Sequence, residues 1–271
     1  MDWESVPQTA AYMEIAAFAD QLGQAARTET LARFGGDNAV EDKMTNGFFD
    51  PVTEADRAAE QAMRQLIHQR FPTHGIIGEE LPVYAGSSDY VWSLDPIDGT
   101  RSFICGLPTW TTLVALLEAG KPIFGLVDAP RLDETYIGFE SQAWMFRNGD
   151  RMPIRASSCV RLSEARLSTT DPSLFEPSAG EAFDRLRRQA KTVRYGHDAY
   201  AYARLAAGSL DLVVESGLQP HDYHALIPLV SAAGATIADW RGGQEYCGGK
   251  ILAASTRELF DEALDYFEVE A

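Results

Sequence analysis

The sequence is short of cysteine, of basic residues and of long hydrophobic runs. Its 271 residues include three cysteines, Cys105, Cys159 and Cys247, which lie far apart and form no C-x-x-C pair. A disulfide framework is therefore not expected, and a reducing cytoplasm is the expected compartment. No apolar run is long enough to span a bilayer, and the first residues carry neither a basic segment nor a long apolar one. Neither membrane insertion nor secretion is expected.

Basic residues are outnumbered, with 23 Lys and Arg against 40 Asp and Glu and a formal net charge of -17. So acidic a surface repels nucleic acids and anionic membranes, so neither is an expected partner. Most of these acids are expected to be solvated, and some to be metal ligands. The patterns G-x-x-x-x-G-K-[ST], G-x-S-x-G and H-E-x-x-H are also missing. The sequence therefore contains no motif that indicates a P-loop enzyme, a serine hydrolase or a zinc protease.

Hydrophobic periodicity predicts two halves, residues 1–155 and 156–271. In the first half, apolar spacing predicts a helix over residues 9–34. Thr53 as N-cap, with Asp56 three residues on, predicts a second helix that ends near residue 71. Strand-like segments follow at 75–77, 90–94, 109–117, 123–127, 134–139, 143–146 and 152–154, the last two flanking the turn signal Asn148-Gly149. This pattern predicts a mostly antiparallel sheet in an α+β arrangement.

The second half alternates strand-like and helix-like segments, which predicts a three-layer α/β unit. Strands are predicted at 167–170, 192–195, 210–214, 236–239 and 251–254, and helices at 181–190, 200–207, from His221 onward, and 257–267. Pro228 is expected to kink the helix that starts at His221. In the first half, the polar stretch over residues 35–51 is expected to be a loop.

The most informative segment is D-P-I-D-G-T at residues 95–100, directly after the predicted strand at 90–94. The proline is expected to force a turn, which lets Asp95, Asp98 and the carbonyl of Ile97 converge on one cation. The backbone N–H groups of the Gly99-Thr100 step can bind an anion. Acids for a metal beside donors for a phosphate indicate metal-assisted phosphate chemistry.

Four other residues have both a structural and a functional interpretation. Glu79 follows the predicted strand at 75–77 and either delivers a carboxylate to the same site or belongs to an exposed acidic loop. Asp56 either caps its helix or orients a hydroxyl or a water. Asp222 is either an N-cap or a further metal ligand, and Thr100 is either a cap or a relay for a proton from a water to Asp56.

Four segments together resemble the inositol monophosphatase-like family of Mg²⁺-dependent phosphatases: residues 50–56, 78–80, 95–100 and the pair His221-Asp222. The resemblance spans nearly the whole chain. It implies the five-layer α-β-α-β-α sandwich of the sugar phosphatases, in agreement with the two predicted halves. The family commonly has an aromatic residue before its last metal-binding aspartate, where this chain has His221. On the resemblance we also expect a homodimer.

The resemblance implies a role for each motif residue. One Mg²⁺ would be held by Glu79, Asp95 and the Ile97 carbonyl, a second by Asp95, Asp98 and Asp222, and a weaker third would lie near Glu79. Asp56 and Thr100 would orient the attacking water, so that they and Glu79 are the expected catalytic residues. The Gly99 and Thr100 amides would hold the phosphate.

Within the family, the chain is most similar to the histidinol-phosphate phosphatase branch. Arg101 after the D-G-T motif, and the segment 194–200 with Arg194 and Asp198, resemble that branch. Glu215 stands seven residues before Asp222, as a substrate-binding acid does in the family. A cationic amine or imidazole would match Glu215 and Asp198, and a neutral polyol would also find hydrogen bonds there. Asp198 is alternatively a helix cap.

We therefore expect a cytoplasmic Mg²⁺-dependent phosphomonoesterase whose partner is a small phosphorylated substrate. The expected reaction is hydrolysis of L-histidinol phosphate to L-histidinol and phosphate, a step of histidine biosynthesis. The alternative substrates are inositol 1-phosphate, another small phosphate ester or a 3′-phosphoadenosine nucleotide. An alternative of another class is an inactive metal-binding scaffold or regulator, and the intact set of motif acids argues against it.

Overall fold

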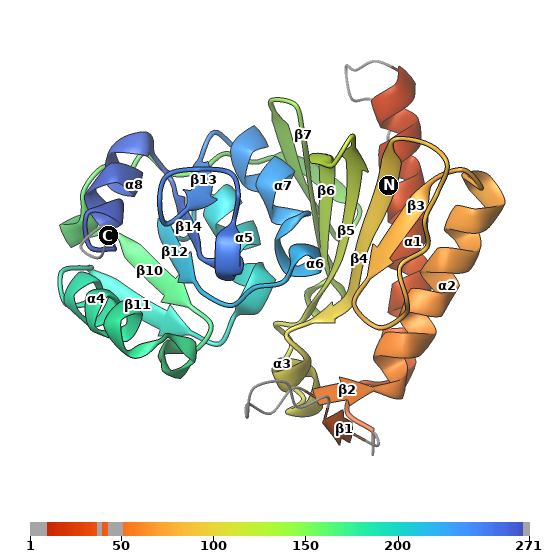
Figure 1. Ribbon diagram of the computed structural model, residues 1–271, viewed down its shortest axis with the longest axis horizontal. Coiled ribbons are helices and arrows are strands. Elements are labelled where there is room, and N and C mark those ends of the chain that lie inside the picture. Colours follow the sequence, from red (N-terminus) through yellow and green to blue (C-terminus); the bar gives the residue numbers. More distant parts are fainter. Residues whose placement is uncertain (1–9, 37–39, 43–50, 268–271) are drawn as a thin grey trace.

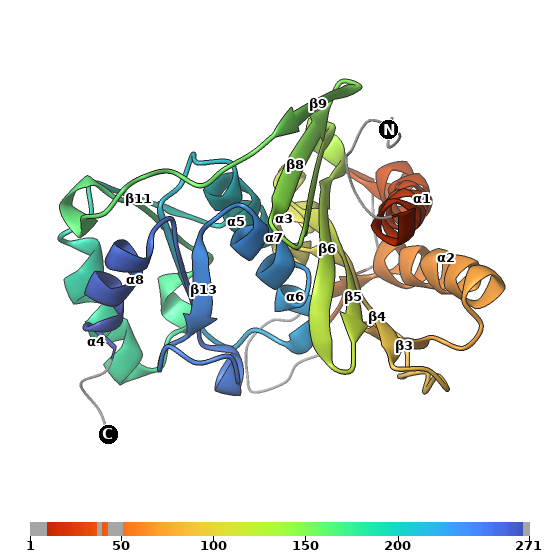
Figure 2. The same ribbon diagram turned by 90° about the horizontal axis from the view of Figure 1, so that it is seen from above.

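The computed structural model describes residues 10–36, 40–42 and 51–267, and the helices and sheets of this part stack in five layers. From right to left in Figure 1 these are a helix pair, a sheet, a layer of helices, a second sheet and an outer helix pair, and the view from above in Figure 2 keeps the same order. The predicted α+β fold, an α-β-α-β-α sandwich, is confirmed.

The first layer is the pair α1 (Ala10–Arg33) and α2 (Glu54–Arg70), as predicted. The start of α2 is a capping box: the Thr53 hydroxyl accepts a hydrogen bond from the Ala55 N–H, and the Asp56 carboxylate accepts one from the Thr53 N–H. A stripe of buried side chains at helical spacing packs with α1 against the sheet: Ala59, Met63 and Ile67.

The first sheet has seven strands within the described residues, in the order β3-β4-β5-β6-β7-β8-β9. Their bounds are β3 (Gly75–Gly78), β4 (Tyr90–Asp98), β5 (Thr111–Glu118), β6 (Lys121–Ala129), β7 (Glu134–Phe139), β8 (Gln142–Arg147) and β9 (Asp150–Pro153). Here β3 and β4 are parallel and the other neighbours antiparallel, as predicted. At the β8–β9 turn, Asn148 and Gly149 have φ of 52° and 82°, the left-handed pair that an Asn-Gly hairpin requires.

The strand β4 does not end where the sequence predicted. It continues past Leu94 to Asp98, and its register with β5 shifts from Asp95 opposite Leu113 to Asp98 opposite Thr111. The β4 side therefore carries one extra residue, a β-bulge, and a bulge accommodates the proline that has no N–H to give to the ladder. The predicted turn at Pro96 was wrong: a bulge inside the strand brings the two aspartates to the strand end instead.

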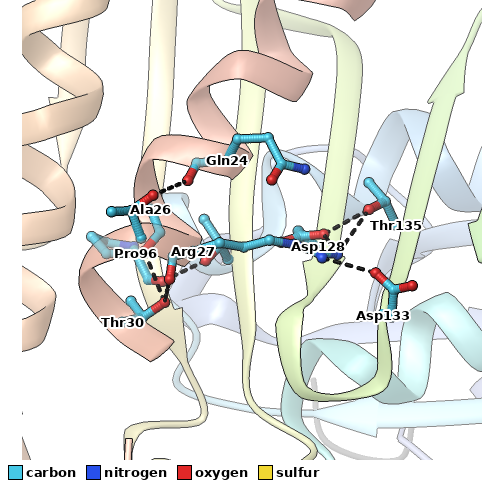
Figure 3. Close-up of polar contacts among 10 residues, drawn as sticks. Gln24, Ala26, Arg27, Thr30, Pro96, Asp128, Asp133 and Thr135 are labelled. Atoms are coloured by element: carbon cyan, nitrogen blue, oxygen red, sulfur yellow. Dashed lines mark hydrogen bonds and ion pairs between the residues drawn. The ribbon is translucent and has the colours of Figure 1, made fainter. Parts of the chain in front are cut away.

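An ion-pair cluster fixes α1 to this sheet (Figure 3). The Arg27 guanidinium donates from Nε to Asp128 Oδ2 and from Nη2 to Asp128 Oδ1, both at 2.7 Å. Its Nη1 donates to Asp133 at 3.0 Å, and the Thr135 hydroxyl donates to Asp128 at 2.6 Å. Asp128 on β6 is 1% exposed, so its buried charge is compensated by a two-point contact with arginine.

The second sheet has five strands within the described residues, in the order β11-β10-β12-β14-β13. Their bounds are β10 (Arg166–Thr169), β11 (Thr192–Tyr195), β12 (Leu212–Glu215), β13 (Thr236–Asp239) and β14 (Ile251–Ala254). The helices α4 (Pro177–Arg187) and α8 (Arg257–Leu264) cover its outer face (Figure 2). Because β10, β11 and β12 are parallel, their carboxyl ends lie at one edge.

The central layer contains α5 (Asp198–Ala206), α6 (Pro220–Tyr223) and α7 (Leu226–Ala232), which lie between the two sheets (Figure 1). Two glycines let α7 approach the first sheet closely. A Cβ on Gly125 would lie 2.0 Å from the Ala225 carbonyl oxygen, and one on Gly138 would lie 2.3 Å from the Leu229 Cα. Any side chain at these positions would push the layers apart.

The helix predicted from His221 with a kink at Pro228 is in fact two helices. The break falls at His224 and Ala225, one turn before the proline. Pro228 has no N–H for the His224 carbonyl and its ring clashes with that carbonyl, so the chain starts a new helix with Pro228 in its first turn. The kink was therefore predicted in the right helix but one turn too late.

The remaining elements are short. They are β1 (Val40–Asp42), β2 (Pro51–Thr53), α3 (Thr100–Ile104), η1 (Pro130–Leu132), η2 (Leu162–Glu164), η3 (Pro172–Leu174) and η4 (Cys247–Gly249). β1 pairs with β2, so the predicted 35–51 loop includes a short strand, and the rest of that prediction lies largely outside the described residues. Residues from both predicted halves share one buried cluster, among them Val127, Tyr136, Leu205 and Val213. The division at residue 155 stays a prediction.

Candidate active site

A cavity of about 650 Å³ opens between the two sheets, and its walls are acidic. The first sheet contributes the end of β4 and the start of α3, while the second contributes the carboxyl ends of β10 and β12. The start of α5 and the helix α6 complete the walls. Six carboxylate side chains line it: Glu79, Asp95, Asp98, Asp198, Glu215 and Asp222. Among the described lining residues, Arg101 is the one arginine or lysine.

The bulge of β4 places Asp95 and Asp98 on this cavity. Asp95 Oδ1 accepts a hydrogen bond from the Ile97 N–H at 3.1 Å, which closes the bulge locally. Asp98 Oδ2 accepts from the Ala199 N–H at 2.7 Å and from the Thr111 hydroxyl at 3.3 Å. Because Ala199 lies at the start of α5, Asp98 also joins the first sheet to the central helices.

Asp222 reaches the same point from α6. Its Oδ2 accepts a hydrogen bond from the Gln219 N–H at 2.7 Å, so Asp222 is the third helical residue of a capping box whose N-cap is Gln219, and the prediction of Asp222 as the N-cap was wrong. Ligand atoms of Asp95, Asp98 and Asp222 nevertheless all lie within 4.8 Å of one another. One oxygen of Asp222 therefore completes the capping box, and the carboxylate still faces the other two acids.

Crowding of like charges raises the pKa of the β4 acids. Burial, and then the charges of Glu79, Asp98 and Asp222, hold the pKa of Asp95 well above its usual range. Burial, and then Asp198 and Asp222, do the same to the pKa of Asp98. Buried carboxylates with acids as neighbours either keep protons or bind a cation. Oxygen ligands at this spacing fit a hard divalent cation.

Glu79 rather than Glu80 faces this cluster, as predicted. Glu79 lines the cavity and its carboxyl hydrogen-bonds that of Asp95. The N–H of Glu80 donates instead to the buried Glu60 carboxylate at 2.7 Å, behind the strand. A Cβ on Gly78 would lie 2.0 Å from a Glu60 oxygen, so the glycine makes room for this carboxylate.

Asp56 is buried, and only one of its two carboxylate oxygens has hydrogen-bond partners among the described residues. Its Oδ2 accepts from the Thr53 N–H at 2.9 Å and from the Thr53 hydroxyl at 2.6 Å, while Oδ1 has no partner in the described structure. Burial, against the two Thr53 hydrogen bonds and with help from the charge of Glu79, raises the pKa of Asp56 to about 6. The capping interpretation therefore holds for one oxygen and leaves the other for a proton.

The predicted contact between Thr100 and Asp56 is not formed among the described residues. The Thr100 hydroxyl donates to the Ile97 carbonyl at 3.0 Å, and the hydroxyl next to Asp56 is that of Thr53. Thr100 is the first residue of α3, after Gly99 with φ of 80°. A Cβ on Gly99 would lie 2.9 Å from Asp198 Oδ2, so glycine here brings the backbone against that carboxylate.

The end of β12 and the start of α5 contribute Glu215 and Asp198 to the cavity. Glu215 Oε1 accepts from the Thr170 N–H at 2.7 Å and its hydroxyl at 2.9 Å, and Oε2 accepts from the Thr169 hydroxyl at 3.3 Å. Burial, opposed by the Thr170 hydroxyl and helped by the charge of Asp198, raises the pKa of Glu215 to about 8. Glu215 is therefore fixed by hydrogen bonds from neutral donors, with no basic partner among these contacts.

Asp198 is not the helix cap that was the alternative prediction. The N-cap of α5 is His197, and Asp198 follows it with φ of 44°. Burial, opposed by the charge of Arg101 and helped by that of Asp222, raises the pKa of Asp198 to about 6. Arg101 also lines the cavity, with its Nη1 4.0 Å from an oxygen of Asp171.

Arg194 is the predicted site residue that this structure places elsewhere. It lines a second cavity of about 190 Å³ with His197, Tyr200 and Arg204. It is not among the described residues that line the main cavity. Sequence reasoning missed several lining residues, among them Thr170 and Tyr202, because no local motif marks them.

Comparison with known proteins agrees with this geometry. The profile of the inositol monophosphatase family matches residues 11–269. The chain belongs to this family. It is 47% identical over 263 residues to the bifunctional phosphatase IMPL2 of Arabidopsis thaliana, covering 93% of this chain and 73% of the relative. The histidinol-phosphatase of Chlorobaculum parvum is 35% identical, with 77% of this chain and 80% of the relative covered.

A solved structure of an inositol monophosphatase from Zymomonas mobilis superposes with a TM-score of 0.84 at 36% identity, over 97% of this chain and all of the other. As a family member, the chain is a phosphoric monoester hydrolase that acts on a phosphate ester, and the family is metal-dependent. Cys105, Cys159 and Cys247 are free, as expected. Within the described residues no helix has the length and apolar character to cross a membrane.

Proposed function

We propose that this family member hydrolyses L-histidinol phosphate to L-histidinol and phosphate, with Mg²⁺ as its metal. The observation that carries the proposal is the pair Glu215 and Asp198, which lines the same cavity as the acids of β4 and α6. With the phosphate held by metal at the β4 and α6 acids, Glu215 and Asp198 would bind a cationic amine or imidazole of the substrate. Similarity to proteins named histidinol-phosphatase supports the same substrate.

The donor set fits two or three Mg²⁺ ions. Glu79, Asp95 and the Ile97 carbonyl would hold one, and Asp95, Asp98 and Asp222 a second, with a weaker third near Glu79. Each of these residues lines the cavity, and the repulsion that raises the pKa of Asp95 and Asp98 is what a cation would relieve. When bound, the metal supplies Lewis-acid stabilisation of phosphoryl charge and a nucleophilic water near neutral pH.

The residues around this set position the substrate. Gly99 and Thr100 line the cavity beside Arg101, and their amides would hold the phosphate. Asp56 would hold the proton that leaves the attacking water, since its Oδ1 has no partner among the described residues and its pKa of about 6 suits proton transfer near neutral pH. Thr100 would relay that proton after its hydroxyl turns away from the Ile97 carbonyl.

An inositol phosphate is the second candidate substrate. It is favoured by the similarity to the inositol monophosphatase from Zymomonas mobilis and by the neutral hydrogen-bond donors around Glu215. Thr170 and the Glu215 carboxyl, protonated below about pH 8, would then bind ring hydroxyls. On the family resemblance we also propose a homodimer, which light scattering on the purified chain tests.

Phosphate release from a substrate panel, with and without Mg²⁺, tests the proposal. The panel contains L-histidinol phosphate, inositol 1-phosphate and a 3′-phosphoadenosine nucleotide. We expect the highest kcat/KM for L-histidinol phosphate and no turnover in EDTA. A higher kcat/KM for inositol 1-phosphate would refute the substrate, and full turnover in EDTA would refute the metal assignment.

A further inference from the structure

Tyr202 on α5 has a buried hydroxyl with no hydrogen-bond partner among the described residues. The side chain is 1% exposed, yet it lines the acidic cavity. Buried polar groups are nearly always paired, so an unpaired one at a ligand cavity needs an explanation. The described structure has another such tyrosine, Tyr246, whose buried hydroxyl also has no partner but which does not line the cavity.

The surroundings of Tyr202 define what it can bind. Burial, and then the charges of Glu215, Asp98 and Asp222, raise the pKa of Tyr202 well above its usual range, which places the ring in the field of these acids. The group therefore remains a neutral phenol, with one O–H donor and acceptor lone pairs.

Glu215 alone offers a cationic group few acceptors. A carboxylate has about four lone-pair positions, and three hydrogen bonds from Thr169 and Thr170 already occupy most of them. An ammonium group brings three N–H donors that must all be satisfied on leaving water. A substrate amine held at this wall therefore requires a further acceptor nearby.

We infer that Tyr202 is a specificity-determining residue whose hydroxyl oxygen accepts a hydrogen bond from the ammonium group of the substrate, beside Glu215. The inference rests on the proposed function, because it needs an aminated phosphate ester. It explains why a hydroxyl is kept at a position where phenylalanine would fill the same space without an unpaired polar atom.

The test uses the variant Tyr202→Phe, with Tyr246→Phe as a matched control. KM and kcat are measured with Mg²⁺ on L-histidinol phosphate and on its analogue that lacks only the amine, 3-(imidazol-4-yl)propyl phosphate. A lost hydrogen bond to a charged group predicts a KM about tenfold higher for L-histidinol phosphate in Tyr202→Phe. For the analogue we expect KM within about twofold of the wild type, and kcat and the melting temperature unchanged, since only the amine contact is lost.

Three outcomes would overturn the inference: an unchanged KM for L-histidinol phosphate, an equal rise with the analogue, or an equal rise in Tyr246→Phe. Hydrolysis of L-histidinol phosphate by the wild-type protein tests the proposed function separately. If it does not hydrolyse L-histidinol phosphate, both the proposed function and this inference fail. If the wild type hydrolyses it, but Tyr202→Phe has the same ratio of KM for L-histidinol phosphate to KM for the analogue as the wild type, only the inference fails.

Discussion

Asp128 and Asp95 lie in the same sheet, are each 1% exposed, and have opposite electrostatic surroundings. Asp128 on β6 receives two hydrogen bonds from Arg27 and one from Thr135. The charged groups that act on Asp95 are carboxylates, chiefly that of Glu79. The two side chains are equally buried, but only Asp128 of the two has an arginine as its partner among these contacts. The comparison distinguishes Asp128, whose ion pair holds two layers together, from Asp95, whose surroundings favour binding of a cation.

The same contrast extends across the molecule. Asp211 receives hydrogen bonds from the Arg166 guanidinium and backbone and from the Ser157 hydroxyl. Asp239 accepts four backbone N–H groups, which against the effect of burial hold its pKa below its usual range. Asp128, Asp211 and Asp239, three buried acids outside the cavity, thus have donors that favour the charged form, whereas several acids in the cavity have raised pKa values.

The largest effect should follow replacement of Asp95, the aspartate whose charged neighbours are carboxylates. In Asp95→Asn one carboxylate shared by both proposed metal positions is lost, so kcat should fall by at least about 1,000-fold. The folded protein should be no less stable in EDTA, because like-charge repulsion is relieved. Steady-state phosphate release and thermal unfolding measure both quantities. Turnover near that of the wild type would contradict the metal assignment.

The paired member should behave in the opposite way. Asp128→Asn leaves the Arg27 guanidinium facing a neutral amide, which should lower the free energy of unfolding by about 3–5 kcal/mol. Urea denaturation measures this, and turnover per folded molecule should stay within about twofold of the wild type.

The control for that variant is Asp261→Asn, which breaks the exposed pair with Arg257 at 2.8 Å. There the expected change is about 0.5 kcal/mol or less. If the two variants lose equal stability, or if Asp128→Asn loses turnover as Asp95→Asn does, the contrast between the two buried aspartates is not the one described.

The smallest effect should come from Glu215→Gln. The amide keeps the hydrogen bonds from Thr170, but it cannot ionise when a cationic substrate binds. KM for L-histidinol phosphate should rise about tenfold, with KM for glycerol 2-phosphate nearly constant. In the wild type, KM for L-histidinol phosphate should fall as pH rises toward about 8, where Glu215 loses its proton, and the variant should lack this dependence. Equal losses on both esters would show that Glu215 does not recognise charge.

Features with a local cause could be predicted from the sequence. The capping box at Thr53 and Asp56 and the hairpin at Asn148 and Gly149 depend on residues within one turn, and both are confirmed. The convergence of Asp95 and Asp98 was also predicted, although a bulge and not a turn produces it. In each case the physical cause lies within four residues of the feature.

Features that depend on packing between layers could not be predicted. The Thr100 hydroxyl donates to the Ile97 carbonyl and not to Asp56, because α3 begins two residues after the end of β4 and places the two groups together. Arg194 lines a separate cavity although it stands in the same segment as Asp198, and Tyr202 lines the site because α5 lies between the sheets. No pattern along the chain encodes these distances.

Thermal unfolding of the wild-type protein against pH, in EDTA and in Mg²⁺, tests the central claim most directly. The pKa values of Asp56 and Asp198 are raised to about 6 and that of Glu215 to about 8 in the folded state. Unfolded values lie near 4. The stability that protonation confers is therefore complete below about pH 4 and is lost as pH rises through 6 and 8.

In EDTA the melting temperature should fall by at least about 5 °C between pH 5 and pH 8. Mg²⁺ should restore most of the loss, with its largest effect at pH 8, where the cavity acids are most charged. A melting temperature that stays flat or rises over this range in EDTA, or that responds to Mg²⁺ no more than to Na⁺ at equal ionic strength, would contradict a cavity of crowded acids that binds a divalent cation.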